Sequence, residues 1–200
     1  MREPTWLTTT PTWVFDLDGT LTVAKHDFAE LRDRLDLDED EDILSVFNHA
    51  SPKRVLELKE VIANWEWAQV PQTQAAPGVH ELLKSLSARH CNLAVLTRNL
   101  REIALATLDE IGCRHYFREG LILGREDAPA KPAPDGILKC LKLMNVGLPA
   151  IMVGDYVYDV QAGRAAGCKT ILTACDFAPD WAPHVDLFVT SLTEVCDAIG

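Results

Sequence analysis

Short apolar runs recur along this chain and alternate with longer stretches whose apolar residues have helical spacing. The runs occupy residues 13–15, 93–96, 121–123, 151–153, 170–172 and 187–189. Runs of this length predict strands that are buried on both faces of a sheet. Between them, residues 79–86 follow the i, i+3, i+4, i+7 pattern of an amphipathic helix, and Gly112 and Gly147 stand where later helices should end. The alternation predicts an α/β fold in which helices cover both faces of a parallel sheet.

Residues 22–77 interrupt this alternation. They contain stripes of apolar residues with helical spacing but no strand-like run. The segment is too long for a connecting loop in a compact domain, and Pro77 marks the return to the alternating pattern. The sequence therefore predicts a core built from residues 1–21 and 78–200, with residues 22–77 inserted after the first strand as a small all-helical cap.

Length and charge narrow the range of partners. Two hundred residues fit one domain with a modest insertion. The net charge of −11 would repel a phosphate backbone, and no basic run offsets it, so we expect no nucleic-acid partner. No apolar run approaches the roughly 20 residues of a membrane span, and the residues before the first strand lack a signal-peptide pattern. We expect no membrane partner and a cytoplasmic protein, as a monomer or homodimer.

The six cysteines agree with that location. None belongs to a C-x-x-C pair, which argues against a zinc site. Most lie inside apolar segments, where a free thiol behaves as a small apolar side chain. We therefore expect free cysteines and a reducing compartment.

Polar residues gather where the apolar runs end. The first run is followed by Asp16 and Asp18, one residue apart, and then by Gly19. Ligands of α/β proteins bind at the carboxyl ends of the strands. Two carboxylates packed together there raise each other's pKa unless a cation or a reaction uses them. The alternative is a turn in which both acids only accept hydrogen bonds from backbone amides.

The second run ends in Thr97. Asn99 lies two residues after Thr97, and Glu102 lies three residues after Asn99, which is the spacing of a capping box. Asn99 is therefore expected to cap the next helix. A hydroxyl just before a helix N-terminus suits an anionic oxygen. Simple capping accounts for Asn99 but does not require Thr97.

Two later segments add a lysine and two more acids. Lys131 precedes a helix opened by prolines, and the run at residues 151–153 leads into Asp155, with Asp159 near the start of the following helix. At one sheet edge these acids cannot all stay ionised without a cation, and Mg²⁺ prefers such oxygen ligands. Lysine and threonine suit a phosphoryl group beside the metal, one carboxylate can be a nucleophile, and another can be an acid and base. These groups fit phosphoryl transfer through an aspartyl-phosphate.

In order along the chain, these residues resemble the four motifs of the haloacid dehalogenase-like (HAD) superfamily. They are D-x-D-G-T at residues 16–20, Thr97, K-P-x-P at residues 131–134 and G-D-x-x-x-D at residues 154–159. The similarity covers about residues 12 to 173. The helical insertion directly after the first motif is similar to the phosphoglycolate phosphatase-like branch. The resemblance implies a Rossmann-like core, with the insertion as a lid and Mg²⁺ as the cofactor.

The resemblance also implies roles for the acids. Asp16 would be the nucleophile and a Mg²⁺ ligand. Asp18 would be the general acid and base, and would lend its backbone carbonyl to the metal. Asp155 would be a further Mg²⁺ ligand, and Asp159 would support the metal without binding it or would orient Lys131.

Three other residues are expected at the substrate phosphate. The resemblance implies that Thr97 and Lys131 bind the phosphate of the substrate. Arg98 is a further candidate, at a position where many relatives carry a small or amide residue. Whether Arg98 reaches the substrate or turns outward stays open.

We therefore predict a HAD-like phosphoric monoester hydrolase. It would use Mg²⁺ to hydrolyse a small phosphorylated metabolite, phosphoglycolate-like or a sugar phosphate, through an aspartyl-phosphate. A sugar-phosphate mutase of the same superfamily is the alternative, because it would use the same groups. A phosphoaspartate module without turnover fits less well, because Asp18 supplies the acid and base that turnover needs.

Overall fold

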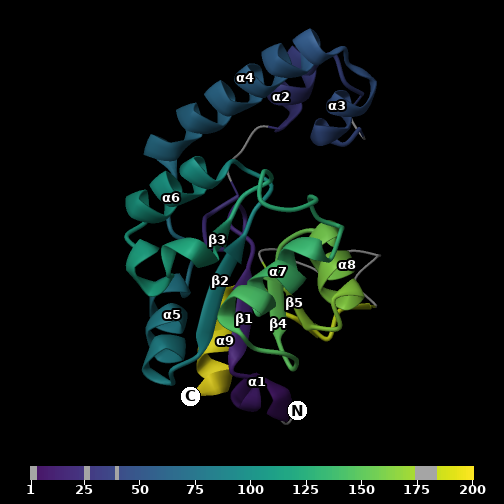
Figure 1. Cartoon of the computed structure of the whole chain (residues 1–200). Coiled ribbons are helices and arrows are strands. Elements are labelled where there is room, and N and C mark those ends of the chain that lie inside the picture. Colours follow the sequence, from purple (N-terminus) through teal and green to yellow (C-terminus); the bar gives the residue numbers. More distant parts are fainter. Residues whose placement is uncertain (1–3, 25–27, 39–40, 174–183) are drawn as a thin grey trace. The chain divides into compact units, whose positions relative to one another are not determined.

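The structure is a computed structural model that describes residues 4–24, 28–38, 41–173 and 184–200 (Figure 1). Its strands are β1 (Thr12–Phe15), β2 (Asn92–Leu96), β3 (Ile122–Leu123), β4 (Ile151–Gly154), β5 (Lys169–Leu172) and β6 (Leu187–Phe188). Its helices are α1 (Thr5–Thr9), α2 (Phe28–Leu35), α3 (Val46–His49), α4 (Pro52–Gln69), α5 (Val79–Ala88), α6 (Arg101–Glu110), α7 (Asp135–Met144), α8 (Val157–Ala165) and α9 (Leu192–Ile199). Each apolar run predicted to be a strand overlaps one.

Within the described residues the six strands form one parallel sheet in the order β3-β2-β1-β4-β5-β6. β1 is central, and Trp13 lies opposite Leu93 of β2 on one side and Ile151 of β4 on the other. The strand order reverses between β1 and β4. At such a switch point an open α/β sheet forms its ligand crevice at the carboxyl ends of the strands. The carboxyl ends of β1 and β4 are therefore the place where a site is expected.

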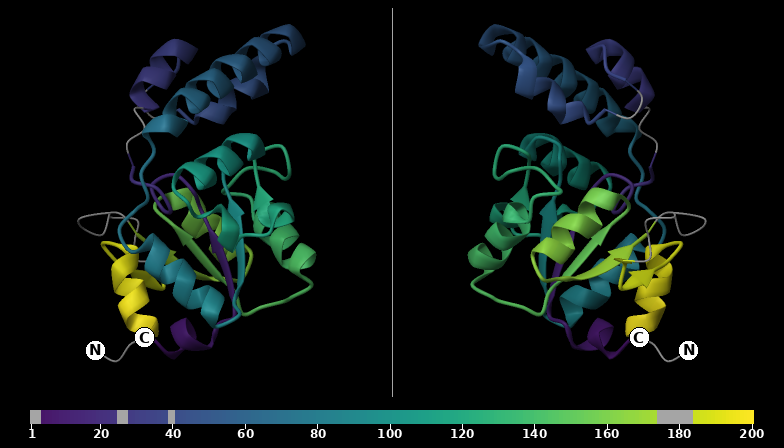
Figure 2. Two further views of the ribbon diagram at one scale, coloured as in Figure 1. Left: turned by 90° about the vertical axis from the view of Figure 1, so that its left-hand side faces the viewer. Right: turned by 90° about the vertical axis from the view of Figure 1, so that its right-hand side faces the viewer.

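Helices cover both faces of this sheet (Figures 1 and 2). Trp13 and Phe15 pack on one face with buried residues of α5, α6 and α9, whereas Val14 packs on the other face with residues of α7 and α8. All four residues of β1 are buried, which explains why Trp13, Val14 and Phe15 are apolar without alternation. The predicted α/β fold, a Rossmann-like parallel sheet with helices on both faces, is confirmed.

The helix ends agree with the sequence at one position and differ at another. Gly112 follows α6 with a φ of +67°, in the left-handed region that favours glycine. After α7, however, Asn145 takes the left-handed conformation with a φ of +56°, and its N–H donates to carbonyls of the last helical turn. The prediction that Gly147 ends this helix is therefore wrong. Asparagine tolerates the left-handed region and ends the helix two residues earlier.

The chain divides into two compact units. One comprises Met1–Ala24 and Thr73–Gly200, and the other is Lys25–Gln72, which lies within the predicted insertion. The regular elements described in the second unit are all helical. This unit has a core of its own, made of Leu31, Leu35, Leu58, Ile62 and Trp65.

The two connections to the insertion lie side by side. Thr22 and Ala75 form an antiparallel bridge, and the Val23 N–H donates to the Gln74 carbonyl at 2.9 Å. The chain thus leaves and re-enters the first unit through paired segments.

No helix in the described part of the chain has the length and apolar character that crossing a membrane requires.

Cys175 lies outside the described residues, and the other five cysteines are free thiols. Burial raises the pKa of Cys113 to about 11, of Cys140 to about 12 and of Cys168 to about 11. These three thiols therefore stay protonated and act as small core side chains.

Candidate active site

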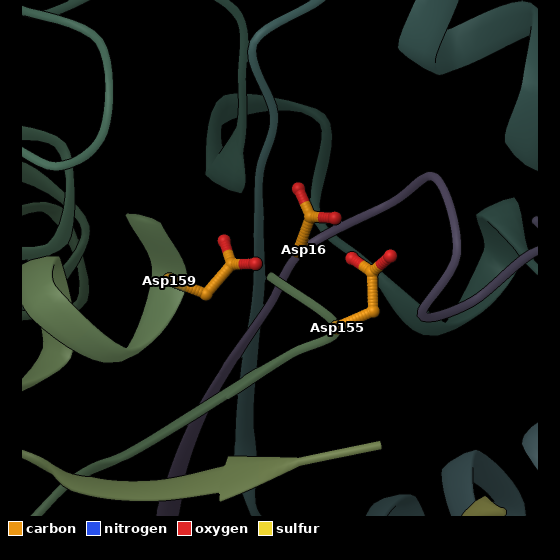
Figure 3. Close-up of side chains that lie close together, drawn as sticks. All are labelled: Asp16, Asp155 and Asp159. Carbon is orange, nitrogen blue, oxygen red and sulfur yellow. The ribbon is translucent and has the colours of Figure 1, made fainter. Parts of the chain in front are cut away.

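Three carboxylates meet at the carboxyl ends of the central strands. Asp16 follows β1, and its N–H donates to the Val153 carbonyl at 2.9 Å, which extends the pairing of β1 with β4. Asp155 follows β4, and Asp159 lies in the first turn of α8. One oxygen from each of these carboxylates lies within 4.8 Å of the others. Figure 3 shows that the three side chains lie close together.

The turn after β1 explains why glycine follows the first two acids. Gly19 has a φ of +79°, where an L side chain is strained, and a Cβ atom on it would lie 2.1 Å from Oδ2 of Asp155. Gly154 serves Asp159 in a similar way, because a Cβ atom there would lie 2.2 Å from that of Asp159. Both glycines leave room for carboxylates that a larger residue would displace from Asp16.

Lys131 places its ammonium between two of the acids. The residue is only 4% exposed, and its Nζ donates to Oδ1 of Asp159 at 2.6 Å and to Oδ1 of Asp16. Burial lowers the pKa of Lys131, but the charges of Asp159 and Asp16 and their hydrogen bonds outweigh it, so the pKa lies above its ordinary value. A lysine that stays charged here can offset negative charge on Asp16 or on a phosphoryl group beside it.

The positive charge of Lys131 does not offset the negative charges of the three neighbouring carboxylates. Burial raises the pKa of Asp16 to about 7, although Lys131 acts against this shift. Burial, together with the charges of Asp16 and Asp159, raises the pKa of Asp155 to about 8. A divalent cation beside Asp16 and Asp155 would favour the ionised form of both. The all-oxygen donor set fits Mg²⁺.

The hydrogen bonds of Asp159 distinguish it from the other two acids. Its Oδ1 accepts from Lys131, and its Oδ2 accepts from the Tyr156 N–H at 3.1 Å. Because both oxygens already have donors, Asp159 is suited to orienting Lys131. Asp16 and Asp155 are the carboxylates better placed to hold a cation.

Thr97 lies at the carboxyl end of β2, the strand next to β1. The residue is 4% exposed, and its N–H donates to the Leu123 carbonyl at 3.0 Å. Its hydroxyl oxygen accepts from the Asn99 N–H at 3.1 Å. A hydroxyl that accepts in this way can still donate its own hydrogen to a phosphoryl oxygen. The structure thus places Thr97 at the same edge of the sheet as Asp16.

Arg98 is held beside α8. Its guanidinium carbon lies 4.7 Å from the ring centroid of Tyr158, and its carbonyl oxygen accepts from the Arg125 guanidinium at 3.0 Å. The first of these is a cation–π contact, which fixes the direction of the Arg98 side chain. The side chain is half-buried rather than turned fully into solvent.

The predicted helix cap at Asn99 is wrong. α6 begins at Arg101, with Leu100 as the N-cap residue, and the Arg101 N–H donates to Oε1 of Glu126 at 2.9 Å. The Asn99 side chain instead donates from Nδ2 to Oδ2 of Asp18 at 2.6 Å. The capping-box spacing is present, but a carboxylate from a distant loop takes the place at the helix end.

Comparison with known proteins agrees with the fold. A family profile described as haloacid dehalogenase-like hydrolase matches residues 11–167. A haloacid dehalogenase-like hydrolase domain-containing protein of Arabidopsis thaliana is 32% identical over 173 residues, which cover 80% of this chain and 69% of that protein. A phosphoglycolate phosphatase of Chromobacterium violaceum is 32% identical over 127 residues, which cover 62% of this chain and 56% of that protein.

Solved structures show the same fold. A HAD hydrolase of family IA, variant 3, from Entamoeba histolytica has a TM-score of 0.77 at 20% identity, with 94% of this chain and 98% of that chain covered. The parallel sheet and the acidic cluster at its switch point thus define a Rossmann-like α/β fold with a candidate site at the carboxyl ends of its strands. More particularly, the chain belongs to the haloacid dehalogenase-like hydrolase family. The prediction of a HAD-like enzyme is confirmed.

Proposed function

We propose that the chain is a Mg²⁺-dependent phosphatase that hydrolyses a small phosphomonoester through an aspartyl-phosphate on Asp16. The observation that carries this proposal is the buried contact of Asp16 with Lys131, with the carboxylate of Asp155 at the same point. With Asp159, three carboxylates lie at this point, and their mutual repulsion disfavours ionisation unless a cation offsets their charge. A metal ion beside a phosphoryl group would supply that charge. The similarity to a phosphoglycolate phosphatase supports the same chemistry.

The first step forms the covalent intermediate. An oxygen of Asp16 bonds to phosphorus, and the bond from phosphorus to the ester oxygen breaks. Asp18 donates a proton to the departing oxygen, so the product leaves as an alcohol. Lys131 and Thr97 donate hydrogen bonds to the phosphoryl oxygens. Mg²⁺ bound by Asp16, Asp155 and the backbone carbonyl of Asp18 would supply positive charge against the approaching dianion.

The second step releases phosphate. Asp18, now a carboxylate, takes a proton from water while the water oxygen bonds to phosphorus. The bond from phosphorus to Asp16 breaks, which returns the free carboxylate and inorganic phosphate. Asp18 ends the cycle protonated, as it began, and one water molecule is consumed.

The proposal is tested by phosphate release from a broad panel of phosphomonoesters. After metal is stripped, EDTA should lower turnover by about 10²–10³-fold relative to Mg²⁺, because the acids then repel the substrate. Mg²⁺ should also raise the Tm of the stripped protein, because a ligand that binds only the folded state stabilises that state. Full activity in EDTA, or no phosphate release from any ester, would overturn the proposal. Isomerisation of a sugar phosphate without phosphate release would identify a mutase instead.

We also propose that the insertion is a cap that selects the substrate and limits access of water. It begins a few residues after Asp18 in the chain, and its paired connections through Thr22 and Ala75 suit a hinge. Among the described residues, its core shares no member with the core around the sheet, which would let it move as one piece.

Replacing residues 25–72 with a short flexible linker tests the cap. The first unit should still fold, because its core contains none of the residues that the structure describes within 25–72. We expect kcat/KM on the preferred substrate to fall by about 100-fold, while slow hydrolysis of 4-nitrophenyl phosphate persists. Circular dichroism checks the fold. Unchanged selectivity in a folded variant would show that the insertion does not determine specificity.

A further inference from the structure

Asn99 joins three segments of the candidate site. Its side-chain Nδ2 donates to Oδ2 of Asp18 at 2.6 Å. Its backbone N–H donates to the Thr97 hydroxyl at 3.1 Å, and its carbonyl accepts from the Arg125 N–H at 2.9 Å. The loop that begins near Arg125 continues to Lys131. One residue therefore links the loops that carry the expected acid/base, the hydroxyl and the lysine.

Helix capping does not account for the Asn99 side chain. Leu100 is the N-cap residue of α6, and Glu126 accepts from the first helical N–H. The Asn99 amide instead reaches across from the end of β2 to the loop after β1. The amide can donate to Oδ2 both when Asp18 is ionised and when Asp18 carries its proton on Oδ1, and the hydrogen bond is charge-assisted in the ionised form.

The bond to Asn99 leaves the two oxygens of Asp18 unequal. Oδ2 accepts from the amide, which restricts the rotation of the carboxylate and with it the direction of Oδ1. Asp18 is half-buried and lies in the loop after β1. A hydrogen bond of defined geometry reduces the number of rotamers that its side chain populates. Proton transfer needs the donor atom within hydrogen-bond reach of the leaving oxygen, so a fixed rotamer raises the fraction of productive encounters.

We propose that Asn99 is a positioning residue that holds Asp18 in the orientation for proton transfer. The proposal rests on the function proposed above. Asn99 touches neither the phosphoryl group nor the metal in this scheme, and it acts through Asp18. Its effect should therefore depend on how much a substrate needs a proton on its leaving group.

The test compares an alkyl phosphate with 4-nitrophenyl phosphate. Asn99→Ala should lower kcat/KM for the alkyl ester by about 10- to 100-fold, as expected for a misplaced general acid. For 4-nitrophenyl phosphate, whose leaving group is a stable anion, the loss of kcat/KM should stay within about 3-fold. The matched control is Asn92→Ala at the opposite end of β2, where the side chain donates to the Thr12 hydroxyl. This control should leave kcat/KM unchanged for both esters.

A double variant separates positioning from a general structural effect. In an Asp18→Asn background, Asn99→Ala should cause no further loss on the alkyl ester, because residues that act as a unit are not additive. Equal losses on both esters, or a full further loss in the double variant, would overturn the inference while leaving the phosphatase intact. Absence of phosphate release by the wild-type protein would refute the proposed function and the inference together.

Discussion

Asp16→Asn should abolish phosphate release from every phosphomonoester, with a loss on the order of 10⁴-fold or more, because no carboxylate remains to form the aspartyl-phosphate. The amide keeps the size of the side chain and an oxygen that can accept from Lys131. Burial raises the pKa of Asp16 from 3.8 to about 7, so in the metal-stripped protein this carboxyl costs the folded state stability as the pH rises from 3.8 to about 7, and the loss is complete at pH 8. A neutral amide removes that loss, so we expect the Tm at pH 8 to be unchanged or slightly higher.

Two further variants make this result interpretable. Asp186→Asn breaks another lysine–aspartate pair, in which Lys169 donates to Asp186 at 2.6 Å, at the amino end of β5. It should retain full activity. Asp16→Ala cannot return to a carboxylate by deamidation and should be equally inactive. Turnover within 10-fold of the wild type in both Asp16 variants would exclude the covalent mechanism.

The sequence was sufficient for the fold because the central strands β1 and β4 are buried on both faces. In β1 every residue is buried, and Trp13, Val14 and Phe15 form a continuous apolar run that is visible in one sequence. Helix ends were less predictable because several residue types satisfy the same backbone. Asn145 adopts the left-handed conformation that Gly147 was expected to supply.

The acids of the site were predictable for a geometric reason. In a parallel sheet the carboxyl ends of all strands lie at one edge, so Asp16 and Asp155 had to be neighbours once β1 and β4 were adjacent. The bond between Asn99 and Asp18 had no such signal. Local spacing favoured a helix cap, and only the position of Glu126 in the folded chain shows that another residue fills that place. Side-chain pairing between loops depends on rotamers, which no residue pattern reports.

Asp18→Asn should separate the two steps of the reaction. General acid–base catalysis is typically worth about 10²–10⁴-fold, and least where the leaving group is already a stable anion. We therefore expect a loss of this size on alkyl phosphates and a small loss in the first step on 4-nitrophenyl phosphate. The amide can still lie beside Asn99 but cannot take a proton from water, so hydrolysis of the aspartyl-phosphate should stay slow on both substrates.

This difference between the steps has a kinetic signature. Rapid-quench measurement with 4-nitrophenyl phosphate should show release of about one equivalent of nitrophenolate per site, followed by a phase limited by hydrolysis of the intermediate. The same sample should contain phosphate bound covalently to Asp16, which mass spectrometry can detect. Equal losses on alkyl and aryl esters with no burst would contradict the role of Asp18 as acid and base. Such a result would instead assign Asp18 to holding the turn after β1, because a structural defect does not distinguish between leaving groups.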